Sequence, residues 1–248
     1  RQKAIEAIAR GRVVVLAGEG LLRTAGLQSP ACRGGLWDEY GVERCATPQA
    51  LVAYPGQAWA AFSAWQSQVY CAAQRPEGVS VAHQSLVQLH RAGLVRGVIC
   101  TTTDGLIRSA GIDETAEIHG AIDRLRCPGC QHRKTAQIPY KGVAPRCPSC
   151  STAMRPDMVL FGEELPRAPR QSAASWVYGG GSLLVLGADL TRPPIHRIPE
   201  EMMQEGGLTI ALGEVARGAV TRVRGVHLGG DIPGDLPQLI QEAIDNRD

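Results

Sequence analysis

Residues 13–20 read VVVLAGEG, and this stretch is the strongest indication of the fold class. Three valines and a leucine in one unbroken apolar run predict a strand over 13–16 that is buried on both faces. Strands of this kind occur in parallel sheets that are covered by helices on both sides. A glycine-rich turn follows at residues 17–20, and a predicted helix over 4–10, ending at Gly11, precedes the run.

Strand and helix signals alternate along the rest of the chain. Residues 80–91 form a predicted helix with Ser80 as its N-cap and Gly93 as its C-terminal stop. Further helical spacing covers 48–73, broken near Pro55, and 236–245. The remaining strands are predicted over 95–100, 158–161, 183–186, 208–212 and 222–228. This alternation predicts an α/β fold with a largely parallel sheet.

Length and composition describe an ordinary globular chain. Its 248 residues suffice for one large domain or for one domain with a small insert. The net charge of +2 gives no reason to expect nucleic acid or a membrane surface as partner. No apolar run reaches the roughly 18 residues that cross a bilayer. The chain shows no signal-peptide pattern, and the sequence does not predict the oligomeric state.

Four of the eight cysteines stand in two C-P-x-C knuckles with the overall spacing C-x2-C-x16-C-x2-C. Each knuckle brings two thiolates to one point, so two knuckles supply the four sulfurs of a tetrahedral zinc site. A redox pair is a weaker alternative, because redox chemistry needs one C-x-x-C rather than two matched ones. The predicted structural zinc ligands are Cys127, Cys130, Cys147 and Cys150. Metal ligation without a disulfide framework favours a reducing, cytoplasmic location.

Residues 124–155 contain few large apolar side chains, so this segment cannot build a core of its own. Zinc would replace that core. We therefore expect a large domain made of residues 1–123 and 156–248, a zinc-binding small domain over 124–155, and a helical insert from part of 40–80 beside it.

Several motifs resemble those of the sirtuin (Sir2-type) family, the NAD-dependent protein-lysine deacylases. The longest, RPDMVLFGE at residues 155–163, resembles the family's R-P-x-V-V-x-F-G-E. EIHG at 117–120 resembles E-L-H-G, and GGLW at 34–37 occurs in bacterial-type members. DGL at 104–106, with AG at 110–111, resembles part of T-Q-N-x-D-G-L-H-x-x-A-G. LPQL at 236–239 fits the family's last helix. The resemblance covers essentially the whole chain in the family's order.

The resemblance implies a Rossmann-like domain with an inserted four-cysteine zinc-ribbon domain, and a cleft between them where NAD and an acylated lysine peptide meet. It gives His119 the role of general base on the nicotinamide ribose. It implies cofactor contacts from Gly18, Gly20, Thr102, Asp104, Gly187 and Asp189, and substrate contacts from Val159, Phe161 and Gly162. Without the resemblance, His119 reads as a hydrogen-bonded bystander, Asp104 as a turn former before glycine, and Phe161 as the end of an apolar strand.

The chain departs from the family pattern at the cofactor site. Where the family has G-A-G-I-S, residues 18–22 read GEGLL, so Glu19 brings a carboxylate to the phosphate turn. Where it has G-T-S, residues 187–189 read GAD, which adds Asp189. The family's Q-N pair is Thr101-Thr102, so an amide that positions the ribose and a water is lost.

Three further positions differ. A gapless alignment puts Pro30 and Ala31 at the Phe-Arg pair of the cofactor loop, whereas a two-residue shift would put Cys32 and Arg33 there. An adenosine-ribose Asn is replaced by Ala211. The Tyr and Arg that select acidic acyl groups in one subfamily fall at Ser63 and Gln66, which argues against succinyl or malonyl recognition.

Three functions remain open on these residues. The chain is a divergent NAD-dependent deacylase, a sirtuin-derived module that binds an acyl-lysine peptide without turnover, or an enzyme whose cleft accepts another nucleotide or small molecule. His119, Asp104 and Phe161 favour the first. Glu19 and Asp189 favour the second, because carboxylates oppose an anionic cofactor. The third function, an enzyme with a changed substrate, would account for a retained His119 beside a changed cofactor loop.

Overall fold

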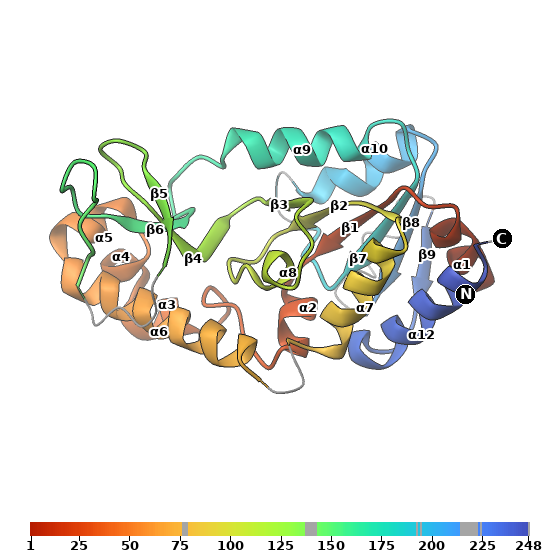
Figure 1. The fold of residues 1–248 in the computed structure, drawn as a ribbon, viewed down its shortest axis with the longest axis horizontal. Coiled ribbons are helices and arrows are strands. Elements are labelled where there is room, and N and C mark those ends of the chain that lie inside the picture. Colours follow the sequence, from red (N-terminus) through yellow and green to blue (C-terminus); the bar gives the residue numbers. More distant parts are fainter. Residues whose placement is uncertain are drawn as a thin grey trace.

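The structure is a computed structural model that describes residues 1–75, 79–136, 143–191, 193, 195–213, 223 and 225–247. It has two parts, a large parallel sheet with its helices and a smaller antiparallel sheet packed beside a group of helices (Figure 1). Among the described residues, no helix combines the length and the apolar content that crossing a membrane requires.

The large sheet confirms the predicted α/β class. Its six strands lie in the order β3-β2-β1-β7-β8-β9, and every pair is parallel. The strands are β1 (Val13–Ala17), β2 (Val95–Cys100), β3 (Thr115–Glu117), β7 (Ser182–Leu186), β8 (Leu208–Leu212) and β9 (Gly225–Leu228). The predicted strand over 222–228 is thus present from Gly225, while positions 222 and 224 lie outside the described residues.

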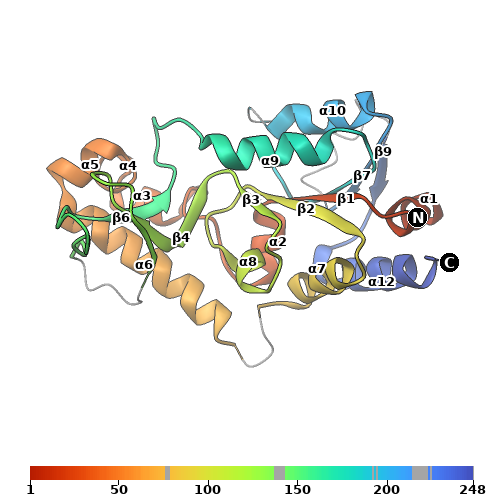
Figure 2. The same ribbon diagram turned by 45° about the horizontal axis from the view of Figure 1, so that its top comes forward.

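Helices cover both faces of this sheet, as the unbroken apolar run of β1 predicts. Val13, Val15 and Ala17 pack with the helices of one face, and Val14 and Leu16 with those of the other. The first face carries α1 (Gln2–Ala9), α7 (Val81–Arg91) and α12 (Ile232–Asp245). The second carries α9 (Arg167–Val177) and α10 (Ile198–Gln204), and Figure 2 shows the layers on either side.

Helix α7 begins and ends as its residues predict. The Ser80 hydroxyl accepts a hydrogen bond from the backbone N–H of His83 at 3.2 Å, which satisfies one of the free amides of the first turn. After Arg91 the chain reverses at Gly93, whose φ of 71° favours glycine. Helix α12 starts at Ile232, four residues earlier than predicted, because Asp231 already has the extended backbone of an N-cap.

The smaller sheet has the order β5-β4-β6 and is formed by β4 (Gly120–Arg126), β5 (Arg133–Thr135) and β6 (Arg155–Met158). Helices α3 (Leu36–Tyr40), α4 (Val42–Cys45), α5 (Pro48–Ala53) and α6 (Pro55–Ala73) lie beside it. Their shared core holds Trp59, Phe62 and Trp65 against Ile122 and Leu125 of β4. The helical spacing is broken at Pro55, as predicted, because α5 ends at Ala53 and α6 begins at the proline.

The predicted strand over 158–161 is wrong. The strand is β6, which ends at Met158, and the chain then leaves the sheet. Phe161 donates its backbone N–H to the carbonyl of Ala46 at 2.9 Å, and Gly162 has a φ of 87°. Leu160 is buried whereas Phe161 is 47% exposed. The apolar residues therefore form an irregular segment held by contacts from several elements.

Candidate functional site

The turns after the central strands meet at one edge of the large sheet. From β1 the chain proceeds through β2 to β3 on one side, and from β7 through β8 to β9 on the other. The loops after β1 and β7 therefore diverge, and the carboxyl edge between these two strands is the topological switch point where open α/β sheets bind ligands. Four strands, β1, β2, β3 and β7, place candidate residues at this edge.

Gly18, Gly20 and Gly187 lie together at the switch point. The Gly18 N–H donates to the carbonyl of Leu186 at 3.1 Å, and the Gly20 N–H to that of Gly187 at 3.0 Å. A Cβ added to Gly20 would stand 2.6 Å from the Gly187 Cα. Only glycines permit the turn before α2 (Glu19–Thr24) and the end of β7 to approach so closely.

Replacing Gly187 with alanine is expected to destabilise the fold by about 3 kcal/mol. Its φ of 59° is unfavourable for alanine, and the new Cβ would meet the Gly20 backbone nitrogen at 2.7 Å. Urea unfolding measures the loss. Gly56→Ala is the control, because no atom lies within 4 Å of a Cβ added there, and it should leave stability nearly unchanged.

The two acids that replace small family residues are satisfied locally. The Glu19 carboxylate lies 3.5 Å from the guanidinium of Arg23, one helical turn further on, and its side chain is 40% exposed. Asp189 is exposed and accepts hydrogen bonds from the backbone N–H of Thr191 at 3.0 Å and from its hydroxyl at 2.6 Å. Neither carboxylate is buried in the glycine turn, so neither carries the desolvation cost that a buried acid would.

Residues 101–104 follow β2. Thr101 contacts the carbonyl of Ala17 at the end of β1 through both its backbone N–H (3.0 Å) and its hydroxyl (3.2 Å). The Thr102 hydroxyl lies 3.2 Å from the Cys100 sulfur. Asp104 is 3% exposed and accepts the backbone N–H of Leu106 at 2.8 Å, at the start of α8 (Leu106–Ser109). Asp104 therefore does form a turn before glycine.

His119 follows β3 and has a defined tautomer. Its Nδ1 lies 2.8 Å from the carbonyl oxygen of Thr101. Because a carbonyl only accepts, Nδ1 carries the proton of the neutral ring, and the lone pair is on Nε2. The ring is half-buried. His119 is thus oriented by the loop after β2, with Nε2 available as a proton acceptor.

The segment with Val159, Phe161 and Gly162 lies beside this histidine. The Val159 N–H donates to the backbone carbonyl of His119 at 2.8 Å. The ends of the segment are joined by Arg155, whose guanidinium contacts both oxygens of Glu163 at 2.5 and 2.9 Å. This ion pair explains why the motif begins with arginine and ends with glutamate.

The loop over 27–35 is held by its own backbone. Trp37 donates its N–H to the carbonyl of Pro30, and Gly35 to that of Cys32, both at 2.9 Å. Pro30 is buried, whereas Ala31 and Arg33 are exposed. Ala31 and Arg33 therefore face solvent, while the buried Pro30 anchors the loop to the protein.

The four predicted zinc ligands form one cluster, with all four sulfur atoms within 4.8 Å of one another. The Cys127 and Cys150 sulfurs are 3.4 Å apart, and those of Cys130 and Cys147 are 3.5 Å apart. Zinc–sulfur bonds of about 2.3 Å in a tetrahedron place sulfurs about 3.8 Å apart. This set of soft ligands therefore fits a structural zinc ion.

The two knuckles have the same backbone turn, which explains their convergence. In the first, Gln131 donates its N–H to the carbonyl of Cys127, and in the second Ser151 donates to Cys147. Gln131 and Ser151 both have a positive φ, 61° and 60°. Two copies of one turn thus face each other across the four sulfurs.

The sequence did not single out His83, a buried residue that lies near Asp104 and α2 rather than near the zinc cluster. Its Nδ1 lies 2.7 Å from the Ser80 hydroxyl, which in turn lies 2.8 Å from that of Thr24 on α2. Burial lowers the pKa of His83 to about 4, and the neighbouring Asp104 carboxylate offsets only part of that effect. The pattern S-x-x-H at a helix start could have revealed it.

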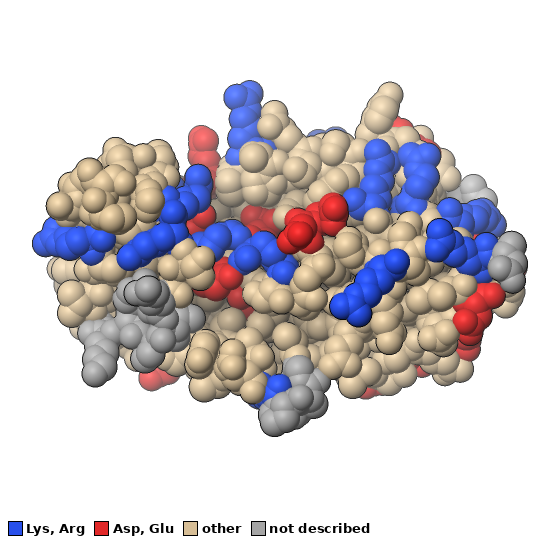
Figure 3. Space-filling view, viewed as in Figure 1, with Lys and Arg blue, Asp and Glu red and all other residues tan. Residues whose placement is uncertain are grey.

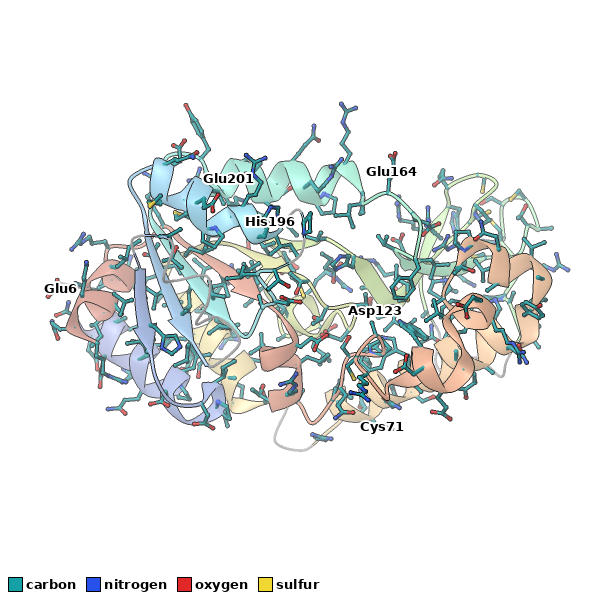
Figure 4. All side chains as sticks on the ribbon, turned by 180° about the vertical axis from the view of Figure 1, so that it is seen from behind. Glu6, Cys71, Asp123, Glu164, His196 and Glu201 are labelled. Atoms are coloured by element: carbon teal, nitrogen blue, oxygen red, sulfur yellow. The ribbon has the colours of Figure 1, made fainter. Side chains whose placement is uncertain are left out.

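The low pKa of His83 predicts acid sensitivity. The unfolded chain takes up this proton near pH 6.5 but the folded chain only near pH 4. The free energy of unfolding therefore has its full value above pH 6.5 and falls by about 3 kcal/mol as the pH drops to 4. Urea unfolding at stepped pH should show this slope, and His83→Gln should reduce it. His196→Gln, which alters an exposed histidine labelled in Figure 4, should keep it.

These features define a class of protein, the α/β proteins with a zinc-ribbon insert. The large sheet is open and parallel, glycine turns meet at its switch point, an oriented histidine lies at the same edge, and four cysteines cluster beside the smaller sheet. Comparison with known proteins agrees. The model of the Sir2 family matches residues 18–194. The chain therefore belongs to the Sir2 family, the sirtuins.

Its relatives include an NAD-dependent protein deacylase 2 from Pyrobaculum aerophilum, 33% identical over 92% of this chain and 90% of that protein. An NAD-dependent protein deacylase from Thermococcus kodakarensis is 30% identical over 98% of this chain and 95% of its own. A mutant Sir2 homologue solved with 2'-O-acetyl ADP ribose is 25% identical, with a TM-score of 0.85 over 100% of this chain and 98% of that chain.

Proposed function

We propose that this protein is an NAD-dependent protein-lysine deacylase in which His119 is the general base. The observation that carries the proposal is the hydrogen bond from Nδ1 of His119 to the carbonyl of Thr101, which leaves Nε2 as a proton acceptor. The names of the two relatives and the 2'-O-acetyl ADP ribose bound to the solved homologue support the same reaction.

The switch point suits a dinucleotide. The close approach of Gly18 and Gly20 to Gly187 leaves backbone rather than side chains between β1 and β7. We assign the cofactor contacts to these glycines together with Thr102, Asp104 and Asp189. When bound, NAD supplies the ribose carbon that receives the acyl oxygen and the nicotinamide that leaves.

His119 has one task in this reaction: its Nε2 accepts a proton from a ribose hydroxyl. The resulting imidazolium keeps its Nδ1–H on the Thr101 carbonyl, so the hydrogen bond that selects the tautomer also stabilises the charged ring. The acyl-lysine peptide would lie along Val159, Phe161 and Gly162, since this segment is bonded to the backbone of His119.

The acyl group is expected to be uncharged. Gln66 is fully buried, and its amide nitrogen donates to the backbone carbonyl of Ile122 at 3.1 Å. Neither Gln66 nor Ser63 offers a positive charge to an acidic acyl group. We expect acetyl-lysine and longer neutral acyl-lysines to be processed in preference to succinyl-lysine.

Peptide binding without turnover is the second candidate, and Thr102 favours it. Its hydroxyl contacts Cys100 at 3.2 Å, and it has no amide to position a water. Against this candidate stands the local pairing of Glu19 and Asp189, which weakens their repulsion of an anionic cofactor.

We also propose a cytoplasmic location, because none of the eight cysteines forms a disulfide.

Calorimetric titration with NAD, followed by nicotinamide release in the presence of an acetyl-lysine peptide, tests the proposal. Saturable NAD binding with peptide-dependent release is expected. NAD binding without release would favour the binding module, and no heat at millimolar NAD would overturn the proposal. A succinyl-lysine peptide of the same sequence tests acyl preference in the same assay.

A further inference from the structure

A chain of ion pairs crosses the region where the two sheets meet. Figure 3 shows acidic and basic side chains alternating there, between the small part and the large sheet. We call its central four residues the charged brace: Arg108 on α8, Glu117 on β3, and Asp123 and Arg124 on β4. Asp123, labelled in Figure 4, lies where the two parts join.

Glu117 is the centre of the charged brace. It is 6% exposed and is held between two guanidinium groups. The Nε of Arg108 lies 3.4 Å from one of its oxygens, and an Nη of Arg124 contacts the other. A carboxylate so far removed from water needs these two positive partners. Asp123 ends this chain of charges by pairing with Arg108.

The charged brace touches both loops that we assign to catalysis. Glu117 stands two residues before His119, at the end of a three-residue strand on the edge of the large sheet. Asp123 packs on Gly105, because a Cβ added to that glycine would lie 3.1 Å from the Asp123 Cγ. Gly105 directly follows Asp104. The same four charges therefore link the strand that leads to His119 with the turn that follows Asp104.

The charged brace also continues into the small sheet. Arg124 extends to Asp157 on β6 at 3.7 Å, and Asp157 pairs with Arg133 on β5 at 3.0 Å. An apolar side chain could fill the buried position of Glu117 with equal or greater stability, whereas ion pairs impose one geometry. Burying the Glu117 carboxylate costs desolvation energy. Its place beside His119 indicates that the position of the histidine must be accurate.

We propose that Arg108, Glu117, Asp123 and Arg124 are positioning residues that set His119 against Asp104 across the joint between the two parts. The proposal rests on the deacylase function proposed above. None of the four side chains is required to touch substrate. They act through the backbone of β3, β4 and the start of α8.

Two variants separate positioning from stability. Glu117→Gln removes the central charge and leaves Arg124 undercompensated, so both stability and kcat should fall. In Glu117→Gln combined with Arg124→Gln, Arg108 keeps its pairing with Asp123, so the melting temperature should recover. The kcat for nicotinamide release should nevertheless stay about 100-fold below wild type, with the KM for the acetyl peptide changed by less than about threefold.

Two controls accompany them. Glu114→Gln removes a nearby carboxylate whose hydrogen bond with His90 is exposed. Ile240→Val lowers stability on α12, a helix that carries none of the four charged residues. Both should retain wild-type kcat. A double variant whose kcat recovers together with its melting temperature would show that the charged brace is structural only, and would overturn the proposal.

A second readout does not depend on turnover. In protein with 15N-labelled histidine, the His119 ring should give one Nδ1-protonated tautomer in the wild type and a mixture of tautomers in both Glu117 variants, without NAD. An unchanged His119 signal in these variants would overturn the positioning role. A wild type that releases no nicotinamide but shows this tautomer change would overturn only the deacylase function.

Discussion

His119→Ala is expected to lower the rate of nicotinamide release by about 10³-fold, the effect of losing a well-placed general base. The ring is held by one hydrogen bond to the Thr101 carbonyl, and alanine leaves no proton acceptor at the position of Nε2. Binding of NAD should persist within about threefold of wild type, because the switch-point glycines do not depend on this side chain. Rapid-quench measurement of nicotinamide and calorimetry with NAD report the two quantities separately.

The matched control is His90→Ala, which removes a histidine from the surface end of α7. It should leave both the rate and the affinity unchanged. Wild-type turnover in His119→Ala would exclude His119 as the base. Loss of NAD binding in the same variant would instead indicate that the ring supports the sheet edge structurally.

Removal of zinc is expected to have the second large effect, loss of order in the smaller sheet. Cys127 and Cys147 are buried in the core that this sheet shares with α3–α6, whereas the two cores of the large sheet contain none of the four ligands. Freshly purified protein should hold one zinc per chain. A strong chelator, or Cys147→Ser, should abolish deacylation. The segment with Val159, Phe161 and Gly162 should then lose its hydrogen bond to the backbone of His119.

Tryptophan fluorescence can follow this change. Trp37, Trp59 and Trp65 are buried in the affected core, so their emission should shift to the red as water enters. Cys71→Ser, at an exposed cysteine outside the cluster, should keep metal content and emission. Metal-free protein with native emission and activity would contradict the structural role of zinc.

The buried strands and the zinc ligands could be predicted because their signals are local. An apolar run such as 13–16 has few alternatives, and one knuckle specifies its turn within four residues. The segment over 158–161 failed for the opposite reason. Its apolar letters fit a strand, but the backbone partners of Val159 and Phe161 are His119 and Ala46, which are distant in sequence. No periodicity in the segment reveals these partners.

At the site, the sequence identified the residues that end up at the sheet edge but not what their side chains do. The orientation of Glu19 depends on Arg23, an i,i+4 pair that could have been read from the sequence. The role of Glu117 depends on the side chains of Arg108 on α8 and Arg124 on β4. Such charges look like ordinary surface residues until the fold brings them together.

The order of the strands has a consequence for biosynthesis. Strand β1 is central, yet one of its two partners, β7, is made only after both zinc knuckles: Val13 pairs with Ser182. During translation the knuckles therefore leave the ribosome while the centre of the large sheet is still open. Metal loading can precede closure of the large sheet, and the late, non-local β1–β7 pairing should be the slow step of folding.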